Sequence, residues 1–131
     1  MDDLFWERVD VFEDSTGRTP FFEYFDQLSP TVQVKLRAII AAILITGPSS
    51  FRTCAYWKPM RGELVGIHEI RFIGPGRIHH RVFCVISNSN GDQSNETLVL
   101  LDGAFKRNGE LLTRARYRQL ADIYAEYRQL F

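Results

Sequence analysis

The feature that most constrains the fold is a run of three apolar segments between Lys58 and Arg107, separated by turn-forming residues. The segments span residues 63–73, 77–87 and 96–101. They are rich in the β-branched and aromatic residues that favour strands. The turn signature Gly-Pro-Gly at 74–76 separates the first two, and a polar loop with its tip expected at Asn90-Gly91 separates the last two. This stretch therefore predicts a small antiparallel sheet.

Basic side chains recur at or between the ends of these segments. They are Lys58, Arg61, Arg71, Arg77, Arg81, Lys106 and Arg107, with His68, His79 and His80 among them. Residues 51–81 carry six bases and two acids, whereas residues 1–28 carry eight acids and two bases, although the whole chain has 16 of each. This distribution predicts an acidic side and a basic side. Charge alone does not distinguish a binding surface from an ordinary solvated one.

The N-terminal part predicts one strand and two helices. Residues 5–12 alternate in polarity and predict a half-buried strand. Thr19-Pro20 and Ser29-Pro30 each combine an N-cap residue with a proline at the first helical position. Gly47-Pro48 ends the second helix, whose C-terminal half is apolar all round and is expected to be buried against the sheet.

A terminal helix is predicted from about Leu112, with Tyr117, Leu120 and Tyr124 on one stripe. The element order is then strand, two helices, three strands and helix. It predicts a single α+β domain over residues 1–131, with a small antiparallel sheet of about four strands, an N-terminal helical pair packed on one face and a C-terminal helix. The other face of the sheet is expected to meet solvent or a ligand, so basic side chains are sought there.

Length and composition fit one globular domain, since the chain has 131 residues of which 45% are hydrophobic. The longest apolar run, residues 38–45, is too short to span a membrane. The start MDDLFWERVD lacks the basic and apolar regions of a signal peptide. Cys54 and Cys84 have no metal-type spacing. A cytoplasmic protein with free thiols and no membrane partner is expected.

Several chemistries are disfavoured by the motifs. His79 and His80 are neighbours, so on a strand they point to opposite faces and do not share a metal ion. The proline at the centre of residues 74–76 removes a backbone N–H that a phosphate-binding loop needs. The sequence contains no GxSxG nucleophile motif, and its basic half has few carboxylates for paired-acid hydrolysis. We expect neither a metal nor a cofactor.

Phosphate chemistry performed by cations alone remains. Guanidinium groups bind a phosphate bidentately and stabilise the charge of a pentacoordinate phosphorus, which makes Arg71 and Arg81 candidates. RNA supplies its own nucleophile, the 2′-OH, so its cleavage needs only proton transfer. The available proton-transfer residues are Lys58, Lys106, His79, His80 and Tyr117. The alternative is that the two arginines only form salt bridges with Glu63, Glu69 or Asp102.

Four short motifs, in their order and spacing, resemble the RelE/HigB-like toxins of bacterial type II toxin–antitoxin systems, and most of all their phage-derived branch. They are K-x-M-R-G-E-L at residues 58–64, H-E-I-R at 68–71, H-R-V-F at 80–83 and L-L-D-G-A-F-K-R at 100–107. The resemblance covers nearly the whole chain. It implies a RelE/ParE-like fold and a metal-independent endoribonuclease that cuts mRNA on the ribosome by 2′-OH attack. It also implies a cognate antitoxin with a helix-turn-helix domain.

Carried over to this chain, the resemblance implies site residues. The family's two strand arginines correspond to Arg71 and Arg81, its basic pair after the last strand to Lys106 and Arg107, and its lysine before the first hairpin to Lys58. His80 stands where the family usually has a tyrosine, and it is expected to move a proton as Lys58 does. Substrate binding is expected to involve Arg61, Arg77, Arg107 and His79.

Two alternatives remain at this point. Some relatives in the superfamily poison gyrase, so the same scaffold could bind a protein target without RNase activity. The chain could also be a plain binding module that holds only its antitoxin partner.

Overall fold

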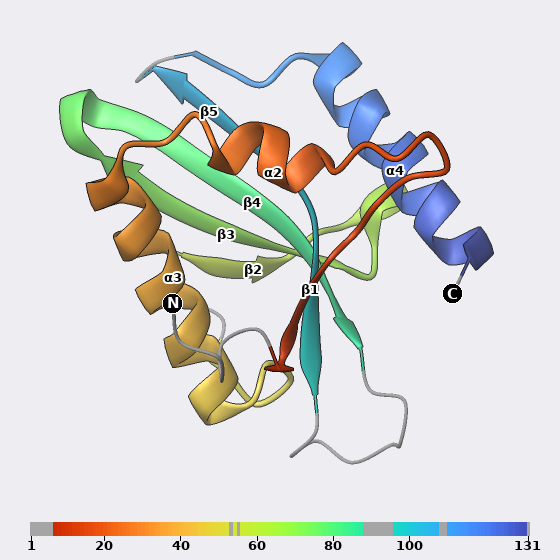
Figure 1. Ribbon diagram of the computed structural model, residues 1–131, viewed down its shortest axis with the longest axis horizontal. Helices are drawn as coiled ribbons and strands as arrows, with labels where there is room; N and C mark the ends of the chain where they lie inside the picture. The colour runs from red at the N-terminus through yellow and green to blue at the C-terminus, as the bar shows by residue number, and fades with distance from the viewer. Residues whose placement is uncertain (1–6, 53, 55, 88–95, 108–109, 131) are drawn as a thin grey trace.

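The computed structural model describes residues 7–52, 54, 56–87, 96–107 and 110–130, which form a five-stranded sheet with helices packed against it (Figure 1). The strands are β1 (Val9–Val11), β2 (Trp57–Pro59), β3 (Ile67–Gly74), β4 (Ile78–Ser87) and β5 (Thr97–Arg107). The helices are α2 (Pro20–Phe25), α3 (Pro30–Thr46) and α4 (Arg114–Leu130), and the short 3₁₀ turns are η1 (Gly62–Leu64) and η2 (Pro75–Arg77). The expected α+β class is confirmed.

The sheet has the order β1-β5-β4-β3-β2 and differs from the prediction in two respects. It contains one strand more than the expected four, because Trp57–Pro59, which precedes the first predicted strand at 63–73, pairs antiparallel with β3. It is also mixed, since β1 runs parallel to β5 with Val9 opposite Leu98. The remaining neighbours are antiparallel, as expected for strands joined by short connections.

Two strand limits differ from the prediction for local reasons. The strand predicted at 63–73 begins only at Ile67, because Gly62 and Gly66 adopt φ values of 66° and 103° and the chain turns there. The strand predicted at 96–101 continues to Arg107 as the second half of β5. Of the strand predicted at 5–12, Val9–Val11 forms β1, and residues 5 and 6 lie outside the described residues. The loop tip expected at Asn90-Gly91 lies outside the described residues.

The N-terminal helices begin where the sequence predicts. Pro20 and Pro30 are the first residues of α2 and α3, and the hydroxyl of Ser29 accepts a hydrogen bond from the Val32 N–H at 3.3 Å. Gly47 ends α3 with a φ of 97°, a conformation that favours glycine. Both helices cover one sheet face, where the larger core is built from residues such as Phe21, Leu36, Ile40, Ile43, Ile70, Val82 and Leu100. The burial expected for the apolar half of α3 is confirmed for Ile40, Ile43 and Leu44 but is wrong for Ile45, which is 84% exposed.

The C-terminal helix α4 packs on the opposite face of the sheet. Its Leu120 and Tyr124 belong to a second core that includes Ile67, Phe83 and Leu101. That face is therefore neither bare nor fully covered, and its remaining part presents polar side chains. Within the described part of the chain, no helix has the length and apolarity needed to span a membrane.

Candidate functional site

The strand register brings the two predicted arginines together. Arg71 of β3 lies directly opposite Arg81 of β4, so both side chains leave the same face of the sheet. Tyr117 of α4 accepts a hydrogen bond from Nη1 of Arg81 at 2.9 Å, which identifies this face as the one that α4 covers in part. On β5, Lys106 lies two positions beyond Ala104, the residue opposite Arg81, and shares the same face. We call Arg71, Arg81 and Lys106 the basic cluster.

A buried carboxylate lies within this cluster. Glu69 Oε1 is 2.7 Å from Nε of Arg71, and Glu69 Oε2 is 3.5 Å from Nη1 of Arg81. The exposed fraction of the side chain is 8% for Glu69, 15% for Arg81 and 37% for Arg71. The salt-bridge alternative is thus present for Glu69, whereas Asp102 pairs with Arg116 instead. One carboxylate does not neutralise three cations, so the cluster remains positively charged.

The charge of the cluster acts on Lys106. Desolvation lowers the pKa of its amine, and the neighbouring Arg81 and Arg71 lower it further by repulsion. Lys106 Nζ also donates a hydrogen bond to the carbonyl oxygen of Glu110 at 2.6 Å. An amine with a lowered pKa is neutral for a larger fraction of the time, which suits a group that accepts a proton.

Two further predicted residues lie on the same sheet face. Lys58 of β2 is directly opposite Glu69 and is exposed. His79 of β4 is directly opposite Lys106 and is half-buried. Both therefore border the basic cluster, Lys58 from β2 and His79 from β4, two residues before Arg81.

His80 lies on the other side of the sheet, with the α2–α3 core. It is 4% exposed, its ring stacks on Phe72 with the ring centroids 4.8 Å apart, and its Nδ1 is 3.1 Å from the hydroxyl of Tyr24. Its pKa is lowered by burial and further by Lys35 and His79. The prediction that His80 moves a proton beside Arg81 is wrong, because consecutive strand residues point to opposite faces. His80 is a packed core residue.

The remaining predicted residues are exposed and lie outside the cluster. Arg77 sits in the β3–β4 turn. Arg107 ends β5 opposite Ile78, and the alternation along β5 directs its side chain to the face of Phe105 and away from Lys106. The backbone N–H of Arg107 donates to Glu110 Oε2 at 3.1 Å. Arg61 precedes η1, beyond Lys58 along the chain. These positions suit long-range attraction of a polyanion rather than direct chemistry.

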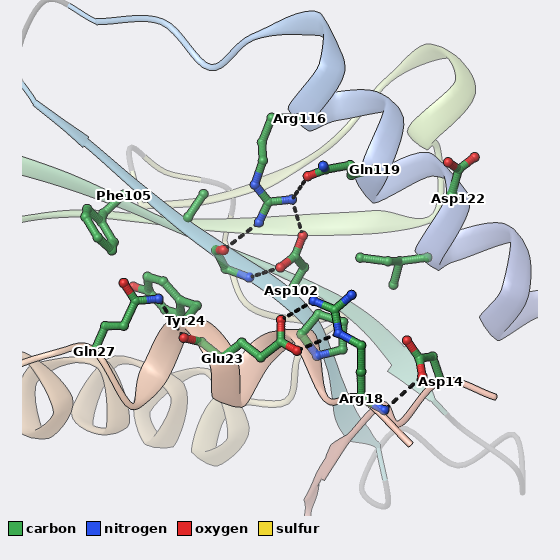
Figure 2. Close-up of a pocket in the computed structure, with 14 residues that line it drawn as sticks. Asp14, Arg18, Glu23, Tyr24, Gln27, Asp102, Phe105, Arg116, Gln119 and Asp122 are labelled. Atoms are coloured by element: carbon green, nitrogen blue, oxygen red, sulfur yellow. Dashed lines mark hydrogen bonds and ion pairs between the residues drawn. The ribbon is translucent and has the colours of Figure 1, made fainter. Parts of the chain in front are cut away.

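A separate groove of about 580 Å³ lies between α2 and α4, beside β5 (Figure 2). Its charged lining residues are Asp14, Glu23, Asp102 and Asp122, with Arg18 and Arg116. Arg116 is 2.6 Å from Asp102 Oδ2 and donates to the carbonyl of Gly103 at 2.8 Å. With four acids and two bases this groove does not suit a phosphate, and it contains none of the predicted site residues. The Arg116–Asp102 pair could not be predicted from the sequence, because the two residues are 14 positions apart and lie on different elements.

The described residues contain no group of three or more His, Cys, Asp or Glu side chains arranged to hold a metal ion. A comparison with models of protein families and with curated proteins finds no significant match to this chain. The resemblance to RelE/HigB-like toxins therefore stays a prediction that depends on the motifs in the sequence.

Proposed function

We propose that this chain is the toxin of a type II toxin–antitoxin pair and that it cleaves mRNA on the ribosome as a metal-independent endoribonuclease. The observation that carries the proposal is the pairing of Arg71 with Arg81 across β3 and β4, with Lys106 beside them on one sheet face. The toxin family, the ribosome and a helix-turn-helix antitoxin enter the proposal through the sequence motifs. The arginine pairing supports the chemistry.

The proposed reaction is an intramolecular transesterification. The 2′-oxygen of a ribose attacks the adjacent phosphorus while its proton passes to a base. The bond from phosphorus to the 5′-oxygen then breaks, and that oxygen takes up a proton. The products are a 2′,3′-cyclic phosphate and a 5′-OH end. Arg71 and Arg81 would bind the phosphate oxygens and stabilise the charge that develops on them.

Proton transfer falls to the lysines of this face. The lowered pKa of Lys106 favours it as the base that receives the 2′-OH proton. Lys58, exposed and opposite Glu69, is the candidate for protonating the leaving 5′-oxygen. His80, which was expected to share this task, is replaced in the proposal because it packs against Phe72 and Tyr24.

Growth after induction in a bacterial host tests the proposal. Expression of the wild-type chain should arrest growth, and Arg71→Ala should remove the arrest because a phosphate ligand is lost. Arg71 suits this test because its side chain is 37% exposed, so its removal leaves the core intact. The matched control is Arg18→Ala, which removes an exposed arginine that pairs with Glu23 in the α2–α4 groove.

Arrest by both variants at the wild-type level would contradict the assignment of Arg71. Arrest without any RNA cleavage would instead favour the gyrase-poison alternative, in which the scaffold binds a protein target. Absence of arrest by the wild-type chain would leave antitoxin binding as its function.

A further inference from the structure

We propose that Glu69 is a positioning residue, which holds the guanidinium groups of Arg71 and Arg81 in the orientation that receives the scissile phosphate. This inference rests on the proposed function, because it assigns a role within the same site. In the sequence analysis, Glu69 is only a possible salt-bridge partner of the two arginines, which is the alternative to their binding a phosphate. The geometry points to a carboxylate that assembles the site.

The first observation is the repulsion between the arginines. Arg71 and Arg81 form a direct cross-strand pair, and like charges at such positions destabilise a sheet. Lys106 adds a third positive charge on the same face. Desolvation lowers the pKa of its amine, and repulsion by both arginines lowers it further. The two guanidinium groups would therefore separate toward solvent if nothing held them.

The second observation is the way in which Glu69 contacts both groups. One carboxylate oxygen faces Nε of Arg71 at 2.7 Å, and the other faces Nη1 of Arg81 at 3.5 Å. Each oxygen is thus directed to a different arginine. A guanidinium has five N–H donors, so each arginine keeps donors for a phosphate after contacting Glu69. Tyr117 fixes Arg81 further through its hydroxyl, at 2.9 Å from Nη1.

The third observation is burial. The side chain of Glu69 is 8% exposed, against 15% for Arg81 and 37% for Arg71. The carboxylate is therefore the least accessible of the three groups to a substrate 2′-OH. Its effect on the reaction would pass through the arginines, which distinguishes it from a catalytic base. Preorganised charge of this kind lowers a reaction barrier because no reorientation is needed when the transition state forms.

RNA binding and kcat should respond to Glu69→Gln in opposite directions. The variant keeps the side-chain shape and removes one negative charge from a positive cluster. Binding of RNA should become tighter and more salt-dependent, whereas kcat should fall by roughly 10²-fold because the arginines lose their orientation. A residue with a merely structural role would not strengthen binding while weakening catalysis.

The experiment uses the full chain with translating ribosomes. Cleavage is measured on a short mRNA, and binding is measured at several salt concentrations on ribosomes that carry the 2′-deoxy analogue of that mRNA, which cannot be cleaved. The matched control is Glu63→Gln, which changes the net charge equally at an exposed position in η1. Unchanged kcat in Glu69→Gln, or equal losses in binding and kcat, would overturn the role of Glu69. A wild-type chain that cleaves no RNA would overturn the proposed function itself, so the two failures are distinguishable.

A second variant covers the case in which Glu69→Gln does not fold. Glu69→Asp keeps the charge and shortens the side chain by one methylene, so it cannot reach both guanidinium groups in the same way. We expect unchanged affinity for the 2′-deoxy analogue and a reduced kcat. Wild-type kcat in Glu69→Asp would contradict the positioning role.

Discussion

At the scale of single residues, the alternation of side chains along β4 separates two kinds of chemistry. Arg81 points to the face of the basic cluster, and its neighbour His80 points into the α2–α3 core. The imidazole of His80 lies against Phe72 and contacts Tyr24, in surroundings that favour its neutral form. A histidine in such a place contributes to the pH dependence of folding rather than to catalysis.

Acidification should therefore destabilise the fold. The pKa values of His80 and His68 are both lowered in the folded chain, mainly by burial, from an ordinary value of 6.5. The unfolded chain binds these protons more readily, so their contribution to stability is complete above about pH 6.5 and is lost as the pH falls below it. Each such proton gives a slope of up to about 1.4 kcal/mol per pH unit.

Urea titrations at a series of pH values measure this dependence. In His80→Phe, which keeps an aromatic ring against Phe72, the fall in the free energy of unfolding between about pH 6.5 and 5 should be shallower than in the wild type. An identical slope in the two proteins would contradict the linkage to His80.

At the scale of secondary-structure elements, the second half of β5 is an edge that side chains cover. The parallel partner β1 pairs only with Leu98–Leu100 of β5, although β5 continues to Arg107. Beyond that point, the Asp102 carboxylate accepts from the backbone N–H of Gly103, and Arg116 of α4 donates to the Gly103 carbonyl. These bonds satisfy the backbone groups of Gly103 at this edge and join α4 to the sheet (Figure 2).

Removal of Arg116 should loosen this junction. Arg116→Ala leaves the carboxylate of Asp102, which is 2% exposed, without its cationic partner. We expect a loss of roughly 1.5–3 kcal/mol in the free energy of unfolding, the range for a hydrogen bond to a charged group. The control Arg114→Ala removes an exposed arginine at the first position of α4 and should change stability little. Equal stabilities of the two variants would contradict the role of the Arg116–Asp102 pair.

Element starts could be predicted wherever a local signal fixes the backbone. The prolines at 20 and 30 mark the first residues of α2 and α3, and Gly47 marks the end of α3. The true length of β5 could not be predicted, because Asp102-Gly103 has the composition of a turn. β5 passes through these two residues, and both make tertiary contacts there. Asp102 pairs with Arg116, and Gly103 lies so close to the ring of Tyr24 that a Cβ would overlap it.

The candidate site could be predicted in part for a similar reason. Strand periodicity and the motifs identified Arg71 and Arg81, and the structure places them opposite each other. Neither the strand periodicity nor the motifs predicted the burial of Glu69 or the contact of Tyr117 with Arg81, since both depend on how α4 lies over the sheet. The role expected for His80 rested on its match to a tyrosine position of the toxin family. The alternation of side chains along β4 instead directs its ring into the α2–α3 core, away from Arg81.

At the scale of the whole molecule, the zero net charge conceals two surfaces of opposite sign. The α2–α4 groove is lined by four acids and two bases, whereas the basic cluster lies with Lys58 and His79 on the sheet face that α4 covers in part. A polyanion would be attracted to one surface and repelled by the other. If the proposed function holds, this arrangement would orient RNA toward Arg71 and Arg81 without a large overall charge.

The most direct test of the account is the identity of the RNA ends that the purified chain produces on translating ribosomes in the presence of a chelator. The account predicts cuts that carry a 2′,3′-cyclic phosphate and a 5′-OH end, made by the wild type and by Arg18→Ala but lost in Arg71→Ala. Intact RNA with the wild-type chain, or cleavage by Arg71→Ala at the wild-type rate, would contradict it.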